Sequence, residues 1–355
     1  MKIFILIMFL ILLIASICMG VSEILLSKIE IPSGMCPIPV LQRVGALSIP
    51  PGSSLSAAID TERGFLYCGN TNTPPSINKI NLSTFTVSST LLLTAAEDDI
   101  YTGVVDAANG FGYFGMNSQG IVKVRLNPFT RIAKVASMFT KSSSAIDVLG
   151  GKVYFGTSAF PGNVVKVDLA TFAIDQTLNF APPEGSRSCV IDTVHGFIYL
   201  GLESSPANII KVSLTNPMVV VGSLLLAVGE NFAFSAVLDP VHNFAYFGTG
   251  DSPGKIVKVD LSTFTRVGSI TCAAGYNSLI SAIIDPVNGF AYFGTFTNPG
   301  RIIKVKLSTF SIVDTLILNG GEANLSGAQI DLSNQLSYWV CNTSPSIVVK
   351  VRLCQ

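Results

Sequence analysis

The sequence is poor in charge and in histidine. Only 12% of its 355 residues are charged, and 22 basic residues balance 22 acidic ones. Without a basic excess there is no long-range field to attract phosphate backbones, so nucleic acid is not an expected partner. Histidine occurs twice, and the His-Glu-x-x-His and Cys-x-x-Cys motifs are absent, so the usual signals of a zinc enzyme are missing. Gly-x-Ser-x-Gly occurs once, from Gly250 to Gly254, but in a loop between two β-rich runs and not between a strand and a helix. A Ser-His-Asp triad would also need one of the two histidines, which occupy turn positions.

The N-terminus has the pattern of a secretory signal. A Met-Lys start is followed by an apolar run from Ile3 to Ile17, and the small residue Gly20 is placed for cleavage. We predict a signal peptide over residues 1–20 and a lead-in over 21–40, hence a secreted or extracellular-surface protein with no membrane span after cleavage. The alternative is an uncleaved anchor, because the apolar run approaches the length of a spanning helix.

The rest of the chain repeats with a period of roughly 45 residues, which is typical of propeller blades. Three residue types recur seven times in one phase, and the tyrosine lies seven positions after each aspartate. The aspartates are Asp60, Asp106, Asp147, Asp192, Asp239, Asp285 and Asp331. The tyrosines are Tyr67, Tyr113, Tyr154, Tyr199, Tyr246, Tyr292 and Tyr338, and the lysines are Lys79, Lys123, Lys166, Lys211, Lys258, Lys304 and Lys350.

Each repeat unit contains four short β-rich runs separated by Gly, Pro, Asn and Ser, with no helical period between them. Each unit therefore predicts one four-stranded antiparallel sheet. Radial stacking of such sheets buries both faces of each, which explains strands that are apolar on both sides. The prediction is an all-β chain whose residues 41–355 form a single seven-bladed β-propeller domain.

The repeated polar residues are expected to be structural. The aspartate precedes a turn and is expected to accept backbone N–H bonds in the first hairpin. The lysine is expected to lay its stem between blades, with its tip at a carboxylate or in solvent. Four positions before the aspartate lies a small hydroxyl residue in six of the seven units. These hydroxyls either line a wet channel or bond to neighbouring backbone, and the second interpretation is favoured.

The last unit lacks its fourth strand, and the missing strand is at the other end of the chain. Residues 41–48 match the fourth strand of another unit, so we expect them to pair with the strand near 347–353 and close the ring. Cys36 precedes the first of these segments and Cys354 follows the second. A disulfide between them would close almost the whole chain and stabilise the fold by about 4–5 kcal/mol.

Four further cysteines occupy pattern positions and are interpreted as buried small hydrophobes. A second bridge between Cys68 and Cys341 is the alternative for that pair, while Cys189 and Cys272 have no evident partner. Export also makes N-glycosylation an expectation at the three sequons. They begin at Asn81, Asn324 and Asn342.

Acidic residues gather in several loops that join the fourth strand of one blade to the first strand of the next. The candidates for a metal site are Glu97, Glu184, Glu230 and Glu322. Such carboxylates around a channel mouth are suited to calcium, or to a cationic or sugar ligand. The alternative interpretation is that they are solvated loop acids. No other cofactor is expected.

Runs such as Tyr246-Phe-Gly-Thr and Tyr292-Phe-Gly-Thr, each followed by a strand like Ile256-Val-Lys-Val, resemble the repeats of YVTN-type propellers of microbial surface-layer proteins. The resemblance covers residues 41–353 and implies the fold, but it transfers no catalytic residue. We therefore expect a non-enzymatic binding or adhesion protein that presents loops on one face to an extracellular protein or carbohydrate. The alternative is a propeller hydrolase or lyase with a metal at the channel mouth.

Overall fold

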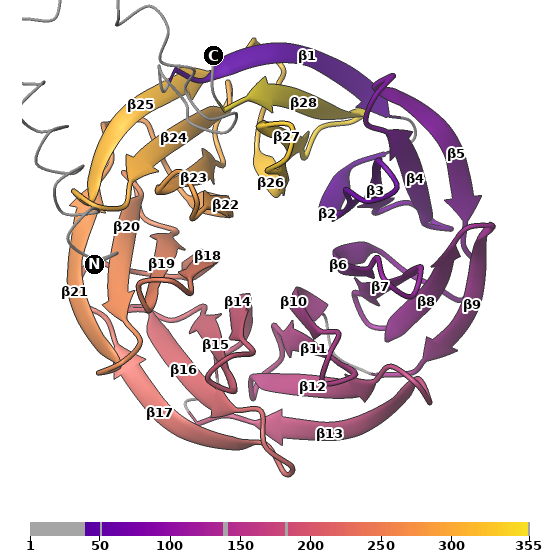
Figure 1. Cartoon of the computed structure of the whole chain (residues 1–355), viewed down its shortest axis with the longest axis horizontal. Coiled ribbons are helices and arrows are strands. Elements are labelled where there is room, and N and C mark those ends of the chain that lie inside the picture. The colour runs from indigo at the N-terminus through magenta and orange to yellow at the C-terminus, as the bar shows by residue number, and fades with distance from the viewer. Residues whose placement is uncertain (1–39, 50–51, 138–140, 182–183, 354–355) are drawn as a thin grey trace, which may run out of the picture. The chain divides into compact units, whose positions relative to one another are not determined.

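A computed structural model of the chain describes residues 40–49, 52–137, 141–181 and 184–353. These residues form strands only, arranged as seven four-stranded antiparallel sheets. The sheets stand around a closed ring, and each runs from an innermost to an outermost strand (Figure 1). The prediction of a seven-bladed all-β propeller is confirmed. Within the described part of the chain, no helix has the length and hydropathy needed to cross a membrane.

Six blades are continuous in sequence and add their strands from the centre outwards. Blades 1 to 3 are β2 (Ser54–Asp60), β3 (Phe65–Asn70), β4 (Ser76–Asn81), β5 (Thr86–Leu92); β6 (Ile100–Asp106), β7 (Phe111–Met116), β8 (Ile121–Leu126), β9 (Phe129–Val135); and β10 (Lys141–Asp147), β11 (Lys152–Thr157), β12 (Asn163–Asp168), β13 (Ala173–Asn179). Blades 4 to 6 are β14 (Ser186–Asp192), β15 (Phe197–Leu202), β16 (Asn208–Ser213), β17 (Val219–Leu225); β18 (Ala233–Asp239), β19 (Phe244–Thr249), β20 (Lys255–Asp260), β21 (Thr265–Thr271); and β22 (Leu279–Asp285), β23 (Phe290–Thr295), β24 (Arg301–Lys306), β25 (Ser311–Ile317).

Blade 7 is assembled from both ends of the ring. Its inner strands are β26 (Leu325–Asp331), β27 (Leu336–Cys341) and β28 (Ser346–Arg352), and its outermost strand is β1 (Gln42–Ile49). Strand β1 runs antiparallel to β28, from Gln42 opposite Arg352 to Ile49 opposite Ser346. This pairing confirms the predicted closure. The proposed Cys36–Cys354 disulfide lies outside the described residues.

The core lies between neighbouring blades, where the repeated tyrosines are almost completely buried. Tyr113 of blade 2 packs in one cluster with Val153 and Phe155 of blade 3. Its ring centroid lies 5.9 Å from that of Phe172, which belongs to the same neighbouring blade. Aromatic pairs at this separation add to the free energy that burial of apolar area supplies.

The repeated aspartate forms the predicted hairpin turn in every blade. In blade 6, Oδ1 of Asp285 accepts the backbone N–H of Asn288 at 3.0 Å, and Oδ2 accepts the side-chain amide of the same residue at 2.7 Å. The carboxylate is buried, so these bonds replace the water it loses. His195 and His242 occupy the Asn288 position in their own blades and bond to the aspartate in the same way.

Four of the six hydroxyls four positions before the aspartates bond to backbone, as the favoured interpretation predicted, whereas Thr102 and Ser143 bond to serine hydroxyls of the next blade. Ser188 Oγ donates to the carbonyl of Ala233 in the next blade at 2.8 Å. Ser235 and Ser281 make the equivalent bond at 2.7 and 2.6 Å. These bonds link adjacent innermost strands, although the same residues also line the central channel.

The repeated lysine lies between blades, but its tip meets other partners than expected. Lys123 Nζ donates to the carbonyl of Leu169 in the next blade at 3.1 Å and lies 4.3 Å from the ring centroid of Phe111. Lys166 does reach a carboxylate, that of Asp175, at 3.1 Å. Burial lowers the pKa of Lys304 to about 8. Rings and carbonyls thus compensate part of the cost of burying the ammonium groups.

Candidate binding site at the channel mouth

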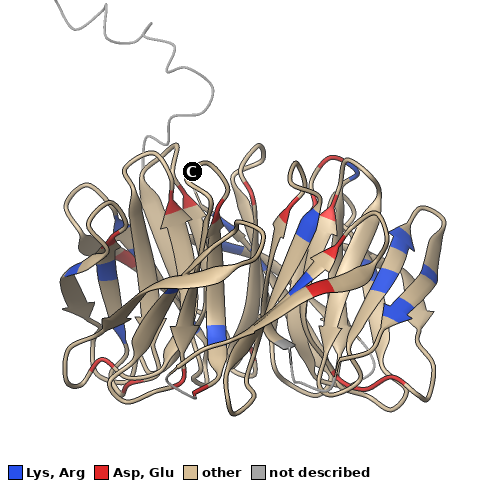
Figure 2. Ribbon diagram, turned by 90° about the horizontal axis from the view of Figure 1, so that it is seen from below, with Lys and Arg blue, Asp and Glu red and all other residues tan. Residues whose placement is uncertain are grey.

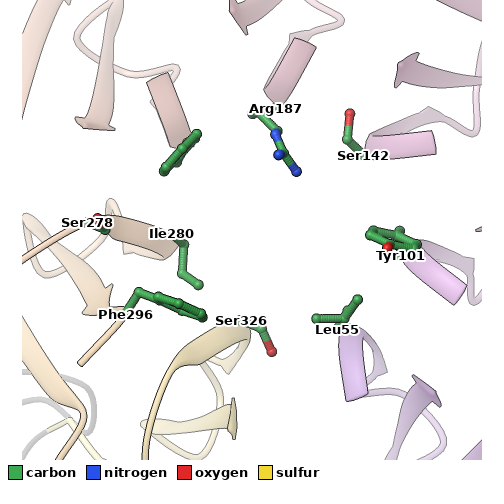
Figure 3. A pocket seen from close by; sticks show the side chains of 9 residues that line it. Leu55, Tyr101, Ser142, Arg187, Ser278, Ile280, Phe296 and Ser326 are labelled. Atoms are coloured by element: carbon green, nitrogen blue, oxygen red, sulfur yellow. The ribbon is translucent and has the colours of Figure 1, made fainter. Parts of the chain in front are cut away.

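One position of the repeat varies from blade to blade. It lies five residues before each turn aspartate, and its seven side chains line a cavity of about 280 Å³ at one end of the central channel (Figure 3). In blade order they are Leu55, Tyr101, Ser142, Arg187, Phe234, Ile280 and Ser326. Ser278 and Phe296 complete the lining. We call this the mouth cavity.

A backbone irregularity places these side chains. In all seven innermost strands the pairing register shifts between the first and third residues, and the residue skipped is the one that lines the cavity. In blade 4, for example, Ser186 and Ser188 are paired and Arg187 is not. A bulge of this kind frees one side chain from the alternation of the strand and redirects it. The same bulge therefore places seven side chains of six residue types.

The cavity has apolar walls on two sides. Ile280 and Phe296 lie on one side of the opening, and Leu55 and Tyr101 lie across from them (Figure 3). Phe234, from the blade next to that of Ile280, also lines the cavity. The ring of Phe234 stacks on that of Phe232, with centroids 5.7 Å apart and planes 19° apart. Gly250 makes room for this stack, because a Cβ there would lie 2.6 Å from the Phe234 ring. The aromatic wall is thus held in place from behind.

Arg187 provides the one cationic side chain of the lining and points toward the middle of the opening (Figure 3). Its Nε and Nη2 donate to the two carboxylate oxygens of Glu203 at 2.7 and 3.0 Å. The guanidinium carbon lies 5.7 Å from the Phe234 ring centroid. The two side chains of the pair are 37% and 31% exposed, so solvent reaches them. Glu203 fixes the plane of the guanidinium without enclosing it.

Arg187 also acts on the phenol of Tyr101. Burial, and after it the charge of Asp99, raises the pKa of its phenol, while Arg187 acts in the opposite direction. The phenol is therefore neutral at physiological pH and available as a hydrogen-bond donor and acceptor.

Three residues just before innermost strands have left-handed backbone conformations. Phe232, Ser278 and Asn324 have φ of 56°, 48° and 55°. Such values are costly for residues other than glycine and persist only where the surroundings impose them. Ser278 lines the cavity, and its hydroxyl donates to the carbonyl of Gly250 at 3.0 Å. The backbone at the rim of blades 5 to 7 is therefore locally strained.

Three of the four acidic loop residues are buried, and the four do not meet at the mouth. Glu97 is 2% exposed. It accepts from Thr94 N at 2.8 Å and from Arg131 Nε at 2.7 Å. Although burial works to raise the pKa of Glu97, these bonds hold it below its ordinary value. Arg131 is on β9, the outermost strand of the blade that the loop enters.

The same pairing recurs in two other blades. Glu230 accepts from Arg266 on β21 at 2.8 Å, and Glu322 accepts from Arg43 on β1 at 3.0 Å. The last of these pairs crosses the ring closure. Each glutamate therefore ties its loop to an outer strand, which corrects the expectation of exposed loop acids.

The fourth acidic candidate differs, because Glu184 has one buried carboxylate oxygen without a hydrogen-bond partner among the described residues. The structure does not bring it together with the other three. Within the described residues no group of three or more His, Cys, Asp or Glu side chains is placed to hold a metal ion. Acidic residues occur in the loops of both faces (Figure 2).

The remaining sequence candidates lie apart from the cavity or on its edge. Asn81 Oδ1 accepts the N–H groups of Ser83 and Thr84 at 3.0 Å, and so forms a turn. Asn324 lies on the rim beside the cavity, and Asn342 follows β27; all three sequon asparagines are partly exposed. The four described cysteines are free thiols. Burial raises the pKa of the Cys68 and Cys341 thiols to about 12, in keeping with the interpretation as small hydrophobes.

Comparison with known proteins supports the fold and nothing finer. No protein-family model matches the sequence, and no curated protein matches it. Among solved structures, the chain resembles Kuenenia stuttgartiensis hydrazine synthase, with a TM-score of 0.73 over 85% of this chain and 96% of the other. The two are 11% identical. The class of protein defined by fold and site is a seven-bladed β-propeller with an irregular cavity at one end of its channel.

Proposed function

We propose that this chain is exported and acts as a non-enzymatic binding protein whose ligand sits in the mouth cavity. The observation that carries the proposal is that unlike side chains, from the position five residues before each turn aspartate, converge on one cavity, whereas the next two positions carry small residues in every blade. The bulge releases the varying position from pairing, so its side chains are available to a ligand. Concave, mostly apolar cavities with a few convergent polar groups are the usual form of a ligand site.

Export is supported by the signal-like residues 1–20. The proposal includes glycosylation at one or more of Asn81, Asn324 and Asn342, and a Cys36–Cys354 disulfide, because an oxidising compartment permits both. It also includes a surface role of the YVTN type, which the Tyr-Phe-Gly-Thr repeats support. No arrangement of described residues favours the hydrolase or lyase alternative.

The test is a binding screen of the mature chain, residues 21–355, against glycans, extracellular proteins and small molecules. The variant Tyr101→Ser/Phe234→Ser should lose binding, because it removes one aromatic side chain from each wall. The matched control is Val194→Ser/Val241→Ser, which changes two exposed hairpin tips at the other end of the channel; these are 80% and 72% exposed. Binding lost only in the control variant, or no binding in any assay, would contradict the proposal.

A further inference from the structure

The distribution of polar groups around the mouth cavity restricts what it can hold. Two sectors are apolar: Ile280 and Phe296, joined by Phe234 of the adjacent blade, form one, and Leu55 and Tyr101 form the other. A sugar carries hydroxyls around its whole rim and would bury several of them against these walls. Each buried hydroxyl left without a partner loses its hydrogen bonds to water without replacement, which disfavours binding. The cavity therefore favours a ligand with an apolar body and one polar end.

The polar end is defined by Arg187. A guanidinium has five N–H donors in a rigid fork, and Glu203 uses the Nε–H and one donor of Nη2. Nη1 makes no hydrogen bond to any described residue, and the side chain points into the opening (Figure 3). A planar anion can accept from this remaining edge in bidentate fashion. A cationic head group would be repelled at the same place.

We propose that the ligand is a small carboxylate with an aryl or branched-alkyl body, which deepens the proposed function and rests on it. The body lies between the two apolar walls, and the carboxylate accepts from Arg187 at the edge opposite Glu203. A cavity of about 280 Å³ suits a compact molecule of this kind. Glu203 holds the guanidinium in position and at the same time repels the ligand carboxylate.

This arrangement predicts opposite effects for the two members of one ion pair. Removing the donors with Arg187→Met should abolish the preference for an acid over its amide. Removing only the charge of the partner with Glu203→Gln should strengthen binding of the acid, by several-fold, because the repulsion goes and the amide oxygen still orients the guanidinium. A purely structural salt bridge would not separate the two variants in this way.

The experiment is calorimetric titration of the mature chain with 3-phenylpropanoate and with its neutral isostere 3-phenylpropanamide. The parent protein should bind the acid at least about tenfold more tightly, which one charge-assisted pair accounts for. The matched control is Arg301→Met, which removes another guanidinium from the same face, at 4.9 Å from the Tyr276 ring and outside the cavity lining. This control should leave both affinities unchanged.

Three results would overturn the inference. The first is equal affinity of the parent for the acid and the amide. The second is a loss of affinity for the acid with Glu203→Gln as large as that with Arg187→Met. The third is no binding of the acid at all. The first comparison needs no variant, so it stands even if a substitution disturbs folding. If the acid fails but another ligand binds and depends on Tyr101 and Phe234, the carboxylate inference falls while the proposed function stands. If nothing binds, both fall.

Discussion

The two ends of the innermost strands differ, although the same seven strands form both. At one end each strand finishes in an aspartate that makes the same turn with the same pair of hydrogen bonds in most blades. Five residues earlier, at the other end, the side chain changes from blade to blade and points into a cavity. The comparison teaches that a position which makes one bonding pattern in every blade keeps its residue type, and that a position released from pairing by a bulge accepts unlike side chains.

The largest expected effect comes from the repeated tyrosine, on the regular side of this comparison. Burial, and after it the charge of Asp331, raises the pKa of Tyr338 to about 12; that of Tyr154 is raised similarly. Such groups stabilise the fold fully below their unfolded pKa of about 10, and the stability is lost as pH rises through the folded value. Urea titrations should show the free energy of unfolding falling steeply between about pH 10 and 12.

The variant Tyr338→Phe sharpens this test. The Tyr338 hydroxyl has no hydrogen-bond partner among the described residues, so its removal should cost little at pH 7. The variant should then lose stability less steeply above about pH 10 than the parent. Parallel curves for the two proteins would show that the buried tyrosines do not govern alkaline unfolding.

A smaller effect compares the two ends of the single strand β22. Asp285→Ala removes a buried carboxylate, leaves the Asn288 donors of a part-buried turn without their acceptor, and should lower the free energy of unfolding by about 1–3 kcal/mol. Ile280→Ala, at the mouth end, removes a half-buried side chain and should cost roughly 1 kcal/mol. Chemical denaturation measures both. An Ile280 loss that exceeds the Asp285 loss would break the division between structural and variable ends.

The smallest effect is expected from making the mouth more regular. Arg187→Ser/Glu203→Ser gives the cavity the hydroxyl already present at Ser142 and Ser326. Because both partners of the ion pair are about one-third exposed, its net contribution is small. The free energy of unfolding should stay within about 1 kcal/mol of the parent. A larger loss, measured by urea titration, would mean that the mouth residues also hold the blades together.

The sequence was sufficient for the architecture because regular positions are visible as a period. Asp239, Tyr246 and Lys258 each mark one structural task repeated in every blade, and the match of residues 41–48 to a fourth strand located the closure. The partners of the lysine tips were not predictable, since a backbone carbonyl of the next blade carries no sequence signature.

The site itself was harder to predict, because its only sequence signal is a repeat position whose residue type differs between blades. Aligning the repeats on the aspartate shows Leu55, Tyr101 and Arg187 in equivalent positions, but the bulge that turns them into one cavity is a backbone property. The acidic loops attracted attention because their residue type suggests chemistry. Their burial against arginines such as Arg131 became evident only from the fold.

The closure of blade 7 also has a consequence for synthesis. Arg43 on β1 and its partner Glu322 are 279 positions apart in the chain, and β28 is the last described strand. The strand made first therefore has no partner until nearly the whole polypeptide exists, and until then β28 has an open edge too. A chain that stops before β28 leaves the ring open and β1 unpaired. Only a chain that reaches β28 can close blade 7.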